Sequence, residues 1–287
     1  DGMVLLEGPV ARVDHDTGIL RGLLTFRTTY FGTISRYLLD GDQRHPSFYD
    51  IQGNAGFDLS KDHRFGLSFL HTSDRTSGIT SGSYGSTMIA LQGHHALSQS
   101  STIQSLLSLY SQFEDLYRGQ SPSITNPKNW TKDINTIILR TGKIELESQV
   151  AGRYSIRSGL NVEQYVYDLL REESLPLPKG ESLSSGLLKK SSYKVGFYGE
   201  NMLRLDRSVL VNLGFRLDHS ALTQELKISP RFLVAYRVDS VTTLNAAWGL
   251  YYQTPTYQQL LSASREGLLP QRMQRAFHYV VGMERVL

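Results

Sequence analysis

The sequence predicts an all-β protein, and more narrowly part of an antiparallel, up-and-down transmembrane β-barrel. Three observations lead to this prediction. Apolar and polar residues alternate over stretches of about a dozen residues, which is the pattern of a strand with one apolar face. No apolar run reaches the roughly eighteen residues that a membrane-spanning helix needs. Short and long connections follow one another in turn along the chain, as they do in outer-membrane barrels.

The clearest alternation lies in residues 47–60, where Tyr49, Ile51 and Phe57 share one parity and polar residues share the other. Residues 64–74 repeat the pattern after a short polar turn, which predicts a tight antiparallel hairpin. A soluble sandwich would also have one apolar face, but its strands are about five or six residues long. Barrel strands of about ten residues fit these segments better.

Similar stripes recur in residues 150–168, 208–219 and 241–254. In a barrel, one face of each strand meets lipid and the other lines a polar lumen. We expect nine apolar side chains to face lipid: Tyr49, Ile51, Phe57, Val211, Leu213, Phe215, Leu244, Trp248 and Leu250. We expect six polar side chains to face the lumen: Arg157, Asn161, Glu163, Asn212, Arg216 and Asp218.

The whole chain, residues 1–287, is interpreted as one domain of about thirteen strands. We expect strands at residues 3–13, 19–38, 47–60, 64–74, 84–97, 101–114, 132–147, 150–168, 192–205, 208–219, 227–238, 241–254 and 276–287. The short connections are expected at residues 14–18, 60–63, 98–100, 148–149, 206–207 and 239–240. The long connections are expected at residues 39–46, 75–83, 115–131, 169–191, 220–226 and 255–275.

The strand count predicts a fragment. If the first strand precedes a short periplasmic turn, it starts on the outer side, whereas the last strand ends on the periplasmic side. A complete bacterial barrel has an even number of strands and both ends in the periplasm. We therefore expect an internal piece of a larger barrel, without its plug domain and barrel ends.

Aromatic residues near the predicted strand ends fit the girdles that mark the two membrane interfaces. The tyrosines assigned to these girdles are Tyr30, Tyr49, Tyr110, Tyr193, Tyr236, Tyr252 and Tyr279. The alternative is that they belong to the core of a soluble β protein.

Composition excludes several classes of function. The chain has no cysteine, so a disulfide framework and a cysteine-based metal or redox site are excluded. The net charge is only +3 and the basic residues are scattered, which does not indicate nucleic-acid binding. His94 and His95 are neighbours on a predicted strand and would point to opposite faces, so one metal ion could not bind both. No catalytic constellation or cofactor motif stands out, and we expect neither an enzyme nor a cofactor.

Several segments nevertheless resemble TonB-dependent outer-membrane receptors. The early segments are LEGP at residues 6–9, FYDIQ at 48–52 and FGLSF at 65–69. The later ones are SPRF at residues 229–232, a segment ending GLYYQTP at 249–255, and HYVVGME at 278–284. The resemblance implies a 22-strand barrel, an N-terminal plug inside it, and a TonB box that couples it to the inner membrane of a Gram-negative bacterium.

In these receptors, outer loops and lumen-facing aromatics capture the substrate. The corresponding cluster here consists of Tyr251, Gln253, Tyr257, Gln258 and Gln259, whose rings and amides suit sugars, chelates or peptides. The alternative is an ordinary loop beside an interface anchor, Tyr252.

The resulting hypothesis is part of a receptor that imports a scarce nutrient, such as a siderophore, cobalamin, an oligosaccharide or a peptide, with energy supplied by TonB. Its expected partners are membrane lipid, the plug of the same parent chain, TonB and the nutrient. The alternatives are a passive porin-like channel and a soluble β-rich binding or adhesion protein.

Overall fold

The computed structural model describes residues 2–12, 19–29, 47–76, 80–119, 130–177, 180–256, 259 and 272–286. The described strands form one sheet in which each strand pairs with its neighbours in the chain, from β1 to β13. They are β1 (Gly2–Arg12), β2 (Ile19–Thr28), β3 (Ser47–Asp58), β4 (His63–Thr76), β5 (Thr80–Ser98), β6 (Ser101–Gly119), β7 (Trp130–Ala151), β8 (Tyr154–Leu177), β9 (Gly180–Arg204), β10 (Val209–Ser220), β11 (Glu225–Arg237), β12 (Thr242–Gln253) and β13 (Gln274–Arg285).

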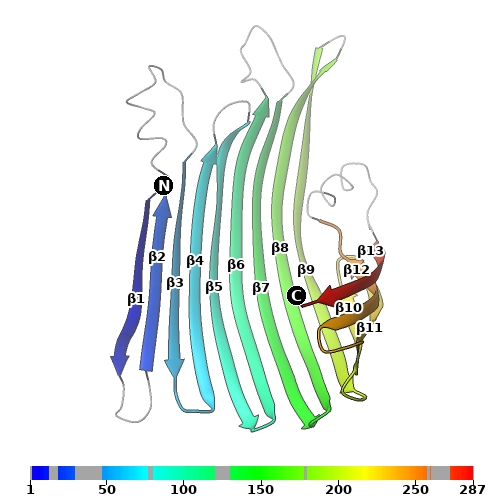
Figure 1. Ribbon diagram of the computed structural model, residues 1–287. Helices are drawn as coiled ribbons and strands as arrows, with labels where there is room; N and C mark the ends of the chain where they lie inside the picture. The colour runs from blue at the N-terminus through cyan, green and yellow to red at the C-terminus, as the bar shows by residue number, and fades with distance from the viewer. Residues whose placement is uncertain are drawn as a thin grey trace.

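Every described strand pair is antiparallel, which confirms the predicted up-and-down topology of a partial barrel. β1 and β13 are the two edges among the described strands, so the sheet remains open. Figure 1 shows the curvature of this sheet, with β10 to β13 turning away from the taller wall of β6 to β9. Among the described residues, no helix is long and apolar enough to cross a membrane.

Short polar segments make the tight connections. The Asp206 carboxylate accepts hydrogen bonds from the backbone N–H groups of Ser208 and Val209, at 2.6 and 2.8 Å. Asp239 accepts from the N–H groups of Val241 and Thr242 in the same way, at 2.8 and 2.7 Å. Aspartate stabilises turns by pairing with backbone two or three residues ahead. These aspartates therefore fix the turns that join β9 to β10 and β11 to β12.

Three of the expected long loops are shorter in the structure than predicted, because the strands on either side extend into them. β8 continues to Leu177 and β9 begins at Gly180, so most of the expected loop at residues 169–191 is an extended hairpin. The expected loop at residues 75–83 shrinks because β4 reaches Thr76 and β5 begins at Thr80. β6 and β7 likewise extend into residues 115–131, and Figure 1 shows how far β6 to β9 rise beyond β1 to β4.

Apolar contacts explain why the hairpin of β8 and β9 continues. Leu169 lies opposite Leu188 and is completely buried. The two leucines pack with Ile137 and Tyr167 in a cluster that Leu222 of the connection between β10 and β11 also contacts. Burial of a leucine side chain contributes roughly 1.5–3 kcal/mol, which favours ordered strands over a solvated loop.

The register divides the sheet into two faces of opposite character. One face, here called the apolar face, carries Phe57, its partner Phe65 and the side chains that the register places on the same side. Many of its large side chains are exposed. The other face, here called the inner wall, carries the polar residues. Its buried members include Asp50, Glu114, Asp133, Asn135, Glu145, Asn161 and Asp218. Because side chains converge and bury one another on the concave side of a curved sheet, the inner wall is that side.

Candidate functional site: the polar inner wall

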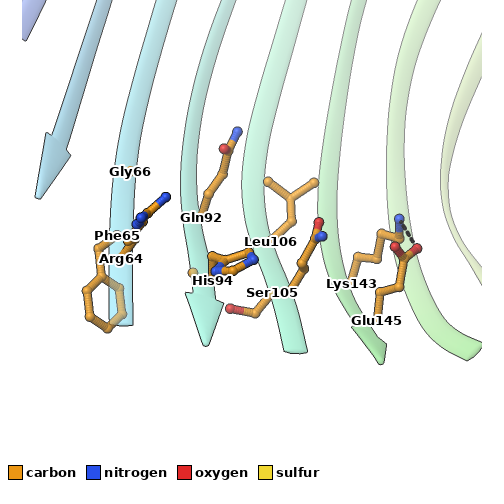
Figure 2. Close-up of a pocket in the computed structure, with 11 residues that line it drawn as sticks. Arg64, Phe65, Gly66, Gln92, His94, Ser105, Leu106, Lys143 and Glu145 are labelled. Carbon is orange, nitrogen blue, oxygen red and sulfur yellow. Dashed lines mark ion pairs between the residues drawn. The ribbon is translucent and has the colours of Figure 1, made fainter. Parts of the chain in front are cut away.

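The inner wall contains a pocket of about 510 Å³ across β4 to β7. Figure 2 shows Arg64, Gln92, His94, Lys143 and Glu145 around this pocket, near the short-turn ends of the strands. Together with Gln104 of β6, these residues come from four consecutive strands, and alternation directs their side chains to the same face. The pocket therefore offers cationic, anionic and amide groups to a polar occupant inside the barrel.

Glu145 lies at the centre of one ion-pair network and is only 8% exposed. Lys143 Nζ lies 2.9 Å from Glu145 Oε2, and the Tyr198 hydroxyl donates a short hydrogen bond to the same oxygen. Arg157 lies 3.6 Å from Glu145 and 3.3 Å from Glu147. A buried carboxylate needs such compensation for its lost hydration, and it receives three partners here.

A second network joins four of the residues that the sequence predicts to face the lumen. Arg216 Nε donates to both carboxylate oxygens of Asp218, at 3.0 and 2.8 Å, and Arg216 Nη2 donates to Asn161 Oδ1 at 3.0 Å. Asn161 Nδ2 in turn donates to Glu163 Oε1 at 3.2 Å. The structure thus brings Asn161, Glu163, Arg216 and Asp218 together on the inner wall.

Glycines let these side chains lie flat against the wall. A Cβ atom at Gly196 would come within 2.6 Å of Arg216 Nη2 and 2.7 Å of Asp218 Oδ1, and it would also contact Asn161. The Tyr198 ring covers Gly159, and the Tyr251 ring covers Gly249. Long side chains over a missing Cβ both protect the backbone and keep the lumen open.

The predicted ligand-binding cluster is only partly assembled. Tyr251 lies on the inner wall, with its ring 4.8 Å from the Arg231 guanidinium and 4.6 Å from the His278 ring. Gln253 pairs with Gln274 in the register between β12 and β13. Gln259 instead exchanges hydrogen bonds with Thr256, which resembles a capping box. Tyr257 and Gln258 lie outside the described residues.

A smaller pocket of about 210 Å³ lies beside Tyr251, between β10 and β13. Two polar atoms in it, Asn212 Oδ1 and Arg231 Nε, are buried without a hydrogen-bond partner among the described residues. Buried groups of this kind normally have a partner, so an occupant with both a donor and an acceptor would fit this pocket.

Sequence reasoning missed Lys143, Glu145, Tyr198, Arg231 and His278. The strand containing Lys143 and Glu145 alternates poorly in sequence, since Ile137, Ile138 and Leu139 occupy both parities. Only the register shows that Glu145 lies opposite Gly159, whose neighbour in β9 is Tyr198. A period-two pattern predicts the face of a side chain but not its partner on another strand.

The nine side chains expected to face lipid all lie on the apolar face. Phe57 lies opposite Phe65, Leu213 opposite Phe232, and Trp248 opposite Tyr279. The same register places Tyr49, Ile51, Val211, Phe215, Leu244 and Leu250 on that face.

The girdle assignment of Tyr110 is wrong. Tyr110 lies opposite Met88 and Leu139 on the inner wall and donates a hydrogen bond to Gln112. The doublet Leu106-Leu107 makes the parity of this strand ambiguous in sequence. Tyr49, Tyr193, Tyr236, Tyr252 and Tyr279 lie on the apolar face, and Tyr30 is outside the described residues.

The two adjacent histidines point to opposite faces. His94 lines the inner-wall pocket, whereas the Nδ1 atoms of His95 and His63 lie 3.0 Å apart on the apolar face. Within the described part of the chain, no group of three or more metal-binding side chains could hold a metal ion.

The alternating faces and the continuous antiparallel sheet define this chain as a section of the wall of an up-and-down β-barrel. Residues 11–282 match the family described as TonB dependent receptor-like, beta-barrel. The chain therefore belongs to this family of TonB-dependent receptor β-barrels.

Solved structures agree on the fold. The chain is similar to the copper transporter OprC, at 12% identity over 95% of this chain and 47% of that chain, with a TM-score of 0.70. It is similar to the ferric citrate transporter FecA, at 11% identity over 98% of this chain and 45% of that chain, with a TM-score of 0.64. It is also similar to the siderophore receptor PirA from Pseudomonas aeruginosa, at 13% identity over 89% and 40% of the two chains, with a TM-score of 0.61.

The chain is much shorter than these similar proteins. The chain spans less than half the length of each of these three proteins. No curated protein matches the sequence.

Proposed function

We propose that this chain forms part of the transmembrane wall of an outer-membrane receptor that imports a scarce nutrient with energy supplied through TonB. Its apolar face contacts lipid, and its inner wall surrounds a plug domain of the same parent chain. The observation that carries this proposal is the continuous inner wall of buried, paired charges opposite a continuous exposed apolar face. A soluble sheet has no reason to expose so many large apolar side chains.

The inner wall supports a plug rather than an empty pore. Its two pockets present an ion pair, the side-chain amides of Gln92 and Gln104, and two buried polar atoms that lack a partner among the described residues, all of which a folded polypeptide can satisfy. The nutrient would then pass when the plug moves, so the wall provides binding groups and no covalent chemistry.

The relatives guide the choice of nutrient. The three similar structures bear the names of a copper transporter, a ferric citrate transporter and a siderophore receptor. Metal ions and metal chelates are therefore the first class to test, followed by cobalamin, oligosaccharides and peptides. Tyr251 and Gln253 are the candidate contacts for this nutrient among the described residues.

Uptake by the full receptor chain tests the proposal. Each nutrient is supplied at limiting concentration to cells that depend on this receptor, with and without functional TonB. We expect uptake of one class of nutrient and its loss without TonB. Uptake that is independent of TonB would instead identify a passive channel.

A wall variant tests the role of the inner face. Arg216→Leu removes the donor that joins Asp218 to Asn161. We expect the full receptor to retain its plug less tightly and to admit large antibiotics that the wild type excludes. Normal plug retention and normal uptake in Arg216→Leu would contradict the assignment of this face to the plug.

A further inference from the structure

A row of polar side chains crosses the apolar face between β7 and β9. Arg140, Gln164 and Tyr193 lie directly opposite one another in the register. Arg140 Nη1 donates to Gln164 Oε1 at 2.7 Å, and Gln164 Nε2 donates to the Tyr193 hydroxyl at 3.1 Å. Arg140 and Tyr193 are exposed, with Tyr193 51% accessible, and Gln164 between them is partly exposed.

Hydrogen-bond directions leave donors available on this row. A guanidinium only donates, so the Gln164 carbonyl oxygen must face Arg140 and its amide must face Tyr193. The Tyr193 oxygen accepts that bond, and its own proton is left to donate outward. Arg140 keeps further N–H groups, and it forms no ion pair within the described part of the chain.

The row interrupts a face that is mostly apolar. Toward the short turns, the next outward side chains are exposed and apolar: Val162, Val195, Ile144, Leu160 and Phe197. Toward the long loops, the next outward residues are Ile138, Val166 and Ser191. Beyond them, Lys189 and Asp168 form an ion pair of 3.0 Å with both side chains more than half exposed. The row and this ion pair are thus two polar levels on the long-loop side of the apolar surface.

Other strands carry polar groups at a comparable level. Tyr49 and His71 approach within 3.3 Å on the apolar face, and His71 Nδ1 lies 2.9 Å from Thr87 Oγ1. Only the row on β7 to β9 combines such a hydrogen-bonded chain with a permanent positive charge among these described groups. Its charge and its outward donors favour an anion as the ligand.

We propose that Arg140, Gln164 and Tyr193 bind the phosphate headgroup of an outer-leaflet lipid. The Arg140 guanidinium pairs with phosphate oxygens, a geometry that arginine favours. Tyr193 donates a further hydrogen bond, and Gln164 positions both donors. The acyl chains lie on the apolar surface beside Val162, Leu160 and Phe197, which is why a lipid fits this site better than a free phosphate ion.

This site rests on the proposed membrane orientation but is independent of the nutrient and of TonB. A receptor could lose this lipid and still transport, and it could fail to transport and still hold the lipid. The two proposals therefore fail separately.

Native mass spectrometry of the full receptor tests the site. The purified protein is titrated in detergent with dimyristoyl phosphatidic acid, or with dimyristoyl phosphatidylcholine as a lipid whose phosphate is shielded. We expect Arg140→Ala to bind phosphatidic acid about tenfold more weakly, because one charge-assisted interaction is lost. Binding of phosphatidylcholine should not change.

Three further variants sharpen the test. Arg140→Lys should bind with intermediate affinity, because it retains the charge but loses the forked donor. Tyr193→Phe should weaken binding less than Arg140→Ala. Arg285→Ala is the matched control. Arg285 is also an exposed arginine, but it lies opposite Thr242 near the short-turn ends of the strands, far from the row. This variant should bind phosphatidic acid like the wild type.

Two results would overturn the proposal. Unchanged affinity of Arg140→Ala for phosphatidic acid would show that the row does not bind the headgroup. Complete displacement of the lipid by an equal concentration of inorganic phosphate would show a site for a free anion instead.

Discussion

Leu213 offers the most direct thermodynamic test of the apolar face. It lies in the middle of β10 on that face, opposite Phe232, and is 53% exposed. If the face contacts lipid, Leu213→Arg places a charge near the bilayer midplane and should cost roughly 2–4 kcal/mol of the free energy of unfolding. If the face contacts water, an exposed substitution should change stability by no more than about 0.5 kcal/mol.

Leu226 provides a matched control. It is 60% exposed on the same face but lies at the beginning of β11, close to the connection from β10. Leu226→Arg should cost only about 0–1 kcal/mol, because the cost of a charge falls near the membrane interface. Guanidinium unfolding of the full receptor in lipid vesicles measures both. Equal effects of the two substitutions would refute a lipid-facing surface.

Three other predictions concern the inner wall and the turns. Asp133 is 2% exposed, and Arg171 donates to its two carboxylate oxygens at 2.6 and 2.9 Å. Arg171→Leu removes this cation and should cost about 3–5 kcal/mol of the free energy of unfolding in denaturant. Lys189→Leu breaks only an exposed pair and should cost no more than about 1 kcal/mol, so similar losses would contradict the distinction. Gly196→Ala should destabilise by about 1–3 kcal/mol in the same assay, because its Cβ displaces Arg216 and Asp218, whereas Gly142→Ala has only Leu107 at 3.6 Å and should be tolerated. The backbone N–H groups of Val241 and then Thr242 hold the pKa of Asp239 below its ordinary value, so its stabilising contribution is present above that ordinary value and is lost as the pH falls through the lowered pKa. Unfolding measured against pH should show this acid loss in the wild type, and an Asp239→Asn variant that keeps the same acid loss would disprove the assignment.

The sequence was sufficient to predict most strands and, where apolar and polar residues alternate strictly, their faces. Alternation alone placed Leu213, Phe215 and Trp248 on one face, and Arg216 and Asp218 on the other, because the side-chain period of a strand is fixed at two. The sequence did not predict the register between strands or the side-chain contacts that the register creates. The contact between Glu145 and Tyr198 joins residues far apart in the chain, and only the pairing of β7, β8 and β9 brings them together.

The errors have specific physical causes. The segment at residues 169–191 contains charged and small residues that are typical of loops, yet the pair of Leu169 and Leu188 extends the hairpin by burial. Tyr110 was assigned to the wrong face because apolar residues occupy both parities of its strand. Local pattern fails where the inner wall itself becomes apolar, as it does around Ile137 and Tyr167.

The alternation of environment along β10 can be measured directly. This chain contains no cysteine, so in the full receptor, with any cysteine elsewhere replaced, single cysteines at Asp206 and at each position from Val209 to Asp218 can carry a spin label in bilayers. Accessibility to oxygen, which dissolves in lipid, should peak at Val211, Leu213 and Phe215 and fall at Asn212, Gly214 and Arg216. A water-soluble relaxation agent that reached Leu213 and Phe215 as readily as it reaches Asp206 in the exposed turn would contradict the central claim that the apolar face lies in a membrane.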